Sequence, residues 1–362
     1  MYLEYKPDWE ETKERFKAWW DHEYFGRCAM ALYAPKDRPE DVKKPELPEK
    51  LEDRWLDFDY LHDLNEYRMS GTSFLCEALP VWNPGYPGWD MLYAYLGSKV
   101  TLKEETGWLD PFIEEGELTD YDYRDIRISP DNHWWKFSQK MHRFAASEAK
   151  GRSLAGLQAL SGCGDVLAGI RGSGKLLTDL MDCPEYVCEF DQHLVGLWAE
   201  AYDVLYEIIR PASEGSTCWF NLWSPGKFYA VQNDFAYMIS PKMFEDIFMP
   251  GIRMHADHLD HAIYHVDGVG NFAHVDAICS VEGIQALQIL PGRGRPSPLH
   301  YMDILKKVQA AGKNLHIMIS ADEVKTALDN LSARGLFIHT YTSSAQEAAD
   351  LLRCVEKWSV DR

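Results

Sequence analysis

The amino-acid sequence predicts an α/β protein made of one (β/α)₈ barrel of the TIM type, with an N-terminal extension of helix and loops. Its 362 residues, 46% of them hydrophobic, suit a single large barrel with insertions. From residue 153 onward, strand-like apolar runs alternate with helical patterns six times, and two further apolar runs precede them. These eight runs match the strand count of the barrel. A doubly wound sheet is the alternative, but its phosphate-binding pattern Gly-x-Gly-x-x-Gly does not follow the early runs.

The N-terminal extension, residues 1–26, is expected to be mainly one helix. Residues 8–25 have the spacing of an amphipathic helix, because Phe16, Trp19 and Trp20 fall on one face while acidic and basic residues fall on the other. Such a helix needs an apolar surface on which to pack. We therefore expect it to lie against the barrel.

The two early apolar runs, 27–35 and 73–82, are interpreted as the first strands. Residues 36–70 are rich in Pro, Lys and Glu where they begin, and residues 83–130 combine acids, aromatics and turn-forming residues without a clear period. We interpret both segments as insertions and loops around the barrel. The whole chain, 1–362, is thus expected to form one domain.

The later part of the chain has a regular rhythm. A helical pattern at 132–150 leads into the strands expected at 153–160, 217–223, 262–267, 284–290, 315–320 and 336–341. Ser240 and Ser297 stand at N-cap positions, each before a proline at the first helical position. Ser320 and Ser344 begin capping boxes, each with a glutamate three residues later. The final helix is expected to end near Trp358.

The pair His265 and Asp267 is the strongest functional candidate. Side chains alternate across a strand, so Ile263, His265 and Asp267 share one face. The pair closes an apolar strand, and Gly268 and Gly270 open the loop beyond it. In parallel α/β folds this end of the strands carries the chemistry. An imidazole and a carboxylate so placed can hold a metal or a substrate, or share a proton; a buried structural pair is the alternative.

Three further candidates follow strands on the same side. Asp234 lies in the loop before the helix that Pro241 begins, and either orients a substrate or caps a turn. Gln288 nears the end of its strand and is expected to orient a polar group of the substrate. Arg293 belongs to a compact basic loop with Arg295, and is either an anion clamp or a solvated arginine.

Asn221, Trp223 and His339 are weaker candidates. Asn221 and Trp223 are expected on one face of the strand at 217–223, near its carboxyl end, where Trp223 is either a pocket wall or a core residue. His339 nears the end of the last strand as a metal ligand or base, or as a buried core histidine.

Charge and composition exclude several classes of function. The formal net charge is −20, from 57 acidic and 37 basic residues, so a nucleic-acid partner is not expected. No apolar run is long enough to span a membrane, and the start of the chain does not resemble a signal peptide. Eight scattered cysteines without a Cys-x-x-Cys pair indicate reduced thiols and a cytoplasmic location.

Five segments resemble, in order and spacing, the uroporphyrinogen decarboxylase superfamily. They are 164–172, 176–185, 234–244, 265–268 and 283–288. Residues 19–35 look like its uncharacterised, methyltransferase-like branch rather than the haem-pathway enzyme. The resemblance implies a distorted (β/α)₈ barrel with one of two chemistries. These are decarboxylation of a tetrapyrrole with many carboxylates, and zinc-dependent methyl transfer between a corrinoid and a thiol.

The sequence departs from both patterns. The decarboxylases carry an Arg-Gln-Ala-Gly-Arg-Tyr motif that binds substrate carboxylates, and here only Arg27 stands in that region. The methyltransferases hold zinc through His-x-Cys and a distant Cys. Here His265 matches, Asp267 replaces the cysteine, and the last strand offers His339. This set could hold a divalent ion, zinc foremost, more weakly than thiolates do.

The function favoured by the sequence is metal-assisted methyl transfer with a corrinoid, supplied by a partner protein, or with another one-carbon carrier. In this interpretation His265 and Asp267 are ligands, Asp234 orients a small-molecule substrate and Arg293 holds an anion. A decarboxylase of a smaller acid and a non-catalytic binding barrel are the alternatives.

Overall fold

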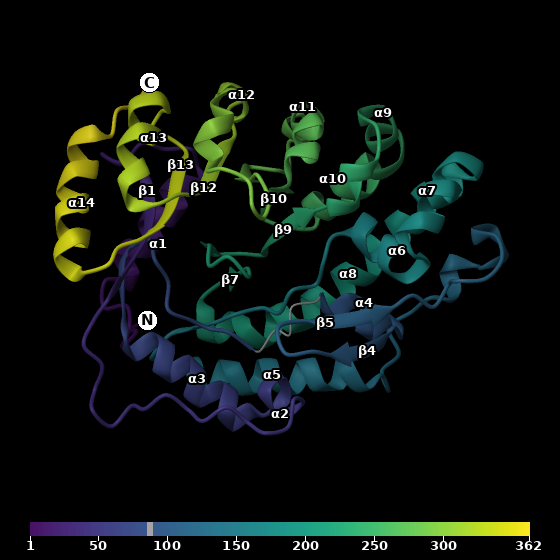
Figure 1. Cartoon of the computed structure of the whole chain (residues 1–362), viewed down its shortest axis with the longest axis horizontal. Helices are drawn as coiled ribbons and strands as arrows, with labels where there is room; N and C mark the ends of the chain where they lie inside the picture. Colours follow the sequence, from purple (N-terminus) through teal and green to yellow (C-terminus); the bar gives the residue numbers. More distant parts are fainter. Residues whose placement is uncertain (85–89) are drawn as a thin grey trace.

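The computed structural model describes residues 1–84 and 90–362, and one mostly parallel sheet forms its centre (Figure 1). Its strand order is β2-β1-β13-β12-β11-β10-β9. Only β2 runs antiparallel to its neighbour, β1. The strands of this sheet are β1 Ala29–Pro35, β2 Thr72–Cys76, β9 Phe228–Gln232, β10 His261–Asp267, β11 Ala286–Leu290, β12 Asn314–Met318 and β13 Leu336–Tyr341.

Two groups of α-helices lie on opposite sides of this sheet. In Figure 1, α9 to α14 follow one another along one side, whereas α2 to α5 gather with the β4–β5 hairpin on the other side. The α-helices are α1 Trp9–Trp20, α2 Asp53–Leu56, α3 Phe58–Ser70, α4 Met91–Leu96, α5 His133–Ala149, α6 Cys163–Arg171, α7 Ser173–Asp182, α8 Pro184–Ser213, α9 Pro241–Met243, α10 Met249–Asp257, α11 Val275–Cys279, α12 Met302–Ala310, α13 Val324–Asn330 and α14 Ala345–Trp358. The hairpin strands are Lys99–Leu102 and Gly107–Asp110. Among the described residues, no helix is both long and apolar enough to cross a membrane.

The predicted helix starts are confirmed. The Ser240 hydroxyl accepts from the Met243 amide, and Ser297 accepts from the Leu299 amide. Ser320 forms the full capping box with Glu323. Ser344 caps α14 as expected. The Glu347 carboxylate, however, accepts from the amide and hydroxyl of Ser343, so the second half of that box is shifted by one residue.

Closure of the expected eight-stranded barrel is not seen among residues 1–84 and 90–362. The run at 153–160 contributes only β6, Leu154–Ala155, which pairs with β3, Val81–Trp82; neither is hydrogen-bonded to the main sheet among the described residues. Beyond β6, one more backbone bond joins the Gly156 amide to the Trp82 carbonyl of β3, and the chain then bonds mainly to side chains. The Leu160 amide donates to the Tyr229 hydroxyl (2.9 Å), and that hydroxyl donates to the Gln158 carbonyl (3.0 Å). These contacts satisfy the backbone and remove the need for a ladder there.

The prediction for residues 217–223 is wrong. This stretch instead joins β7 Ser216–Thr217 to β8 Trp223–Ser224, a short antiparallel pair. The strand that enters the sheet is the next one, β9, after the turn at Pro225 and Gly226. The run at 73–82 likewise divides between β2 and β3. Asn221 interrupts the first apolar run, and Glu77 and Pro80 interrupt the second, so the pairing partners decide where each strand begins and ends.

Helix α1 closes the end of the sheet from which the strands begin. Trp19 packs edge-on against Phe337 of β13 (5.3 Å between ring centroids), and Trp20 packs against Phe228 of β9 (5.1 Å). Trp223 is 1% exposed, packs on Trp9, and donates its indole N–H to the Ser213 carbonyl. Trp223 is therefore a core residue at the amino end of the strands and does not face the opposite, carboxyl end.

Candidate functional site

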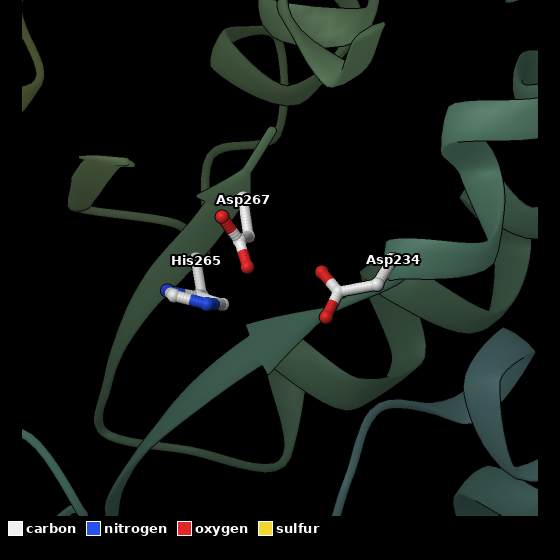
Figure 2. A group of neighbouring side chains, drawn as sticks. All are labelled: Asp234, His265 and Asp267. Carbon is white, nitrogen blue, oxygen red and sulfur yellow. The ribbon is translucent and has the colours of Figure 1, made fainter. Parts of the chain in front are cut away.

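Three side chains meet at the carboxyl ends of β9 and β10 (Figure 2). His265 and Asp267 come from β10, two residues apart on one face, as the alternation predicts. Asp234 opens the 3₁₀ helix η3, Asp234–Met238, directly beyond β9. One ligand atom from each residue lies within 4.8 Å of the other two. The carboxylates of Asp234 and Asp267 face each other across a gap that the His265 ring borders.

Strand pairing brings Asp234 to this position. Gln232 is the register partner of His265, so the chain leaves β9 beside the histidine. Asn233 then caps η3 by accepting from the Ala236 amide, which turns Asp234 toward β10. Asp165 of α6 holds this turn by accepting from the Phe235 amide (2.7 Å) and from Nε2 of Gln232 (3.2 Å).

The loop beyond β10 is shaped by glycine. Gly268 has φ +82°, a conformation that side chains disfavour. A Cβ on Gly270 would come within 2.6 Å of the Tyr237 ring, so this residue lets the ring lie against the loop. The strand therefore stops directly after Asp267.

Hydrogen bonding fixes which nitrogen of His265 can bind a ligand. Nδ1 of His265 lies 2.5 Å from Oε1 of Gln288, and an amide oxygen can only accept. The proton is thus on Nδ1, and Nε2 keeps its lone pair. Burial lowers the pKa of His265, against the opposing effects of Gln288 and Asp267, which favours the neutral ring that metals bind. Trp219 packs edge-on against the ring at 4.7 Å.

A small acidic cavity of about 370 Å³ adjoins the group at Asp234. Its lining includes Asp90, Tyr93, Asp165 and Asp234, and no lysine or arginine of the described chain takes part in it. Removal of water and repulsion by Asp165, Asp267 and Asp90 raise the pKa of Asp234 to about 8, although its side chain is open to solvent on one side. Burial, with Asp165 nearby, raises the pKa of Asp90 to about 7. A cation placed here would relieve this repulsion.

The other predicted residues divide into those near the site and those away from it. Gln288 is fully buried and contacts His265 from behind, where it cannot touch a substrate directly. Asn221, with φ +59°, lies in the β7–β8 loop whose Trp219 contacts the His265 ring. Arg293 is exposed and directly follows Gly292. The loop passes close to Asp267 at this point, because a Cβ added at Gly292 would stand 3.8 Å from Oδ1 of Asp267.

His339 is not part of the group that meets at His265. Its ring stacks on Tyr33 (4.9 Å between centroids), and its Nε2 lies 3.0 Å from the Tyr341 hydroxyl. Burial lowers the pKa of His339 to about 4. In the structure Asp234 takes the third position that the sequence analysis gave to His339.

Four residues of the site were not anticipated from the sequence. Gln232, Asp165, Asp90 and Tyr93 all line the cavity beside Asp234. Gln232 could have been found, because it ends the mostly apolar run at 228–232 and is followed by Asn233 and Asp234. Asp165 comes from α6, Tyr93 from α4 and Asp90 from the N-cap of α4. No local pattern in the sequence connects these three residues with β10.

Comparisons with known proteins bear on the fold. No family model matches the chain, and no curated protein sequence does. Among solved structures, a methyltransferase from Methanosarcina mazei aligns with a TM-score of 0.58 and 11% sequence identity, over 96% of this chain and 98% of that one. At this identity the likeness shows a shared fold over nearly the whole length of both chains.

Proposed function

We propose that the protein is a metal-assisted methyltransferase of the uroporphyrinogen decarboxylase superfamily. It would move a methyl group from a corrinoid, or another one-carbon carrier, to a small nucleophilic substrate. The observation that carries the proposal is the convergence of Asp234, His265 and Asp267 within 4.8 Å at the carboxyl ends of the strands. The fold shared with a methyltransferase supports it.

The residues present fit a divalent ion. Two carboxylates and one neutral imidazole are a common set for zinc and for harder metals. Ligand atoms on a tetrahedral zinc, with bonds of about 2.0–2.1 Å, stand about 3.4 Å apart, so the three side chains must move inward slightly. Asp234 is exposed and free to do so. Gln288 already holds the His265 ring in the tautomer that a metal requires.

The ion, when bound, would supply positive charge that makes a thiol or similar nucleophile more acidic. The chain's own residues bind and orient. His265 and Asp267 fix the position of the ion, and Trp219 shields one side of the His265 ring from water. Asp90 lies in the same cavity as Asp234, and with a pKa raised to about 7 it is suited to accept the nucleophile's proton. With a methylcorrinoid as donor, the nucleophile would bond to the methyl carbon, and the electron pair of the cleaved carbon–cobalt bond would leave with the corrinoid.

The electrostatics disfavour a polyanionic substrate. The guanidinium of Arg27 makes two contacts of 2.8 Å with the buried Glu77 and lies before β1, at the amino end of the sheet. It is thus unavailable to a tetrapyrrole bound at the carboxyl end. We expect no useful turnover of uroporphyrinogen, measured anaerobically as stepwise loss of carboxylates.

A decarboxylase acting on a smaller acid is the second candidate. Asp90 and Asp234 have raised pKa values and can carry protons near neutral pH. A protonated carboxyl could deliver the proton that replaces CO₂.

The test uses the full chain, stripped with a chelator and reloaded with one equivalent of Zn²⁺. Methylcobalamin is supplied anaerobically with a panel of small thiols and amines, and transfer is measured as cob(I)alamin absorbance together with the mass of the methylated product. We expect His265→Ala to lower the rate by at least about 100-fold, while His300→Ala, at an exposed surface histidine, leaves it unchanged. Release of CO₂ from an acid without a methyl acceptor, unaffected by zinc, would favour the second candidate.

A further inference from the structure

Four polar side chains form a row across one face of the sheet, at one level. They are Gln232 on β9, His265 on β10, Gln288 on β11 and His316 on β12. Each is the register partner of the next. Directly paired residues of parallel strands point to the same face, so the four side chains stand side by side. Their exposures of 9%, 6%, 0% and 0% leave them almost without water.

Buried polar groups are costly unless they are hydrogen-bonded. The first half of the row meets this requirement, because Gln232 donates to Asp165 and Nδ1 of His265 donates to Oε1 of Gln288. The second half does not. Nε2 of Gln288 and both ring nitrogens of His316 have no partner among the described residues.

The surroundings of His316 favour a neutral ring. Phe220 stacks on it at 5.5 Å and Phe337 packs at 5.4 Å. Burial, with His339 and His265 nearby, lowers the pKa of His316 well below its usual value. A neutral imidazole has one acceptor nitrogen, and its neighbour Gln288 has an amide N–H that needs an acceptor.

We propose that Gln288 and His316 are positioning residues that together set the tautomer and the orientation of His265. His316 accepts from the Gln288 amide nitrogen through one buried water, or directly after a small rotation of either side chain. This contact holds the amide so that its oxygen faces Nδ1 of His265, and the Nε2 lone pair of His265 is then directed at the ligand position.

We call the chain of contacts from His316 through Gln288 to His265 the relay. The opposite orientation of the Gln288 amide shows what the relay prevents. If the amide turned over, its N–H₂ would face Nδ1 and the proton of His265 would move to Nε2. A ring protonated at Nε2 cannot bind a metal through that atom. The relay therefore selects the binding-competent tautomer before any ligand arrives.

This inference rests on the proposed metal at His265, so its first test uses Zn²⁺ alone, in competition with a chelator. Gln288→Met keeps the size of the side chain and removes its acceptor, and we expect zinc affinity to fall by roughly 10–100-fold. Gln288→Glu retains an acceptor and should restore most of the affinity. His316→Phe should weaken binding by roughly 3–10-fold, because it acts only through Gln288. The control His142→Phe removes another buried histidine, on α5, and should leave zinc affinity unchanged.

The double variant separates positioning from a merely structural role. If His316 acts through Gln288, the variant Gln288→Met/His316→Phe binds zinc as weakly as Gln288→Met alone. If the two losses in binding free energy add, the residues act independently and the relay is refuted.

A second measurement does not depend on a metal. In the metal-free protein, the ¹⁵N chemical shifts of the His265 ring report which nitrogen carries the proton. We expect Nδ1 in the wild type and in Gln288→Glu, and a mixture of tautomers in Gln288→Met. Protonation at Nε2 in the wild type would overturn the relay. Protonation at Nδ1 with no zinc binding would retain the relay and refute the proposed metal function.

Discussion

The two ends of the sheet treat buried charge in opposite ways. At the amino end, beneath α1, a buried carboxylate is surrounded by guanidinium groups. At the carboxyl end, several carboxylates share one cavity whose lining includes no lysine or arginine of the described chain. Both arrangements use the same kind of side chain, and only the partners differ.

Glu77 represents the amino end. It is fully buried, yet Arg27 binds both of its oxygens and Arg15 donates from 2.5 Å. The Met30 amide adds a fourth contact. Burial acts to raise the pKa of Glu77, but the two guanidiniums outweigh it and hold this pKa below its usual value. A carboxylate held in this way stabilises the folded protein.

Asp234 and Asp90 represent the carboxyl end. Their pKa values are raised, first by loss of water and then by the carboxylates around them. Nothing in the fold of the described chain requires this repulsion. Carboxyl groups that have no cationic partner in this cavity and lie near a histidine with a directed lone pair indicate a site kept for a ligand rather than for stability. Four predictions test this difference.

The largest effect is expected at the amino end. Glu77→Gln removes the buried counter-charge of Arg27 and one of the acidic partners of Arg15, which also pairs with Asp8. The change should lower the free energy of unfolding by about 3–5 kcal/mol. Urea unfolding measures the change. Asp90→Asn, the matched change at the carboxyl end, should not destabilise the protein at pH 8. Equal losses in the two variants would show that the two ends do not differ.

The next largest effect is expected on zinc affinity, when the ligand atom at position 267 is changed. Asp267→Cys should raise zinc affinity, on the order of 10-fold, because a thiolate is the softer ligand. Asp267→Ala should lower it by roughly 10–100-fold. Binding should also weaken as the pH falls, since only deprotonated groups ligate. Chelator competition measures all three proteins, and indistinguishable affinities would remove Asp267 from the metal site.

A pH dependence of stability follows from Asp90. Its pKa is about 7 in the folded protein, above the unfolded value of 3.8, so folding takes up a proton between these pH values. The free energy of unfolding of the metal-free protein should therefore fall as the pH rises from about 4 to about 7, by on the order of 1 kcal/mol or more. Asp90→Asn should remove this contribution. The control Asp63→Asn, at an exposed carboxylate, should leave the pH dependence unchanged. A curve that is the same in Asp90→Asn and wild type would contradict the assignment.

The smallest effect concerns Arg293, a cation near the rim of the acidic site. If it holds an anionic group of the substrate, Arg293→Ala should raise the KM for substrates with one carboxylate or phosphate by about 3–10-fold, with kcat unchanged, as suits a partly exposed contact. The exposed Arg253 on α10 provides the control substitution. An unchanged KM would leave Arg293 as a solvated loop residue.

The sequence alone determined the features that depend on local periodicity and capping. Strands β10 and β13 and the helix starts at Ser240, Ser297 and Ser320 lie where the pattern places them. These features depend on residues a few positions apart, so a linear pattern contains them. The same alternation put His265 and Asp267 on one face of a strand.

Tertiary structure alone decided which residues join that pair. Asp234 rather than His339 completes the group, because the register of β9 against β10 brings it there. Gln288 supports His265 from behind, and Trp223 packs under α1. Each outcome depends on strand register or on packing between segments far apart in the chain. A one-residue change of register would alter the facing side chains without changing the local sequence pattern.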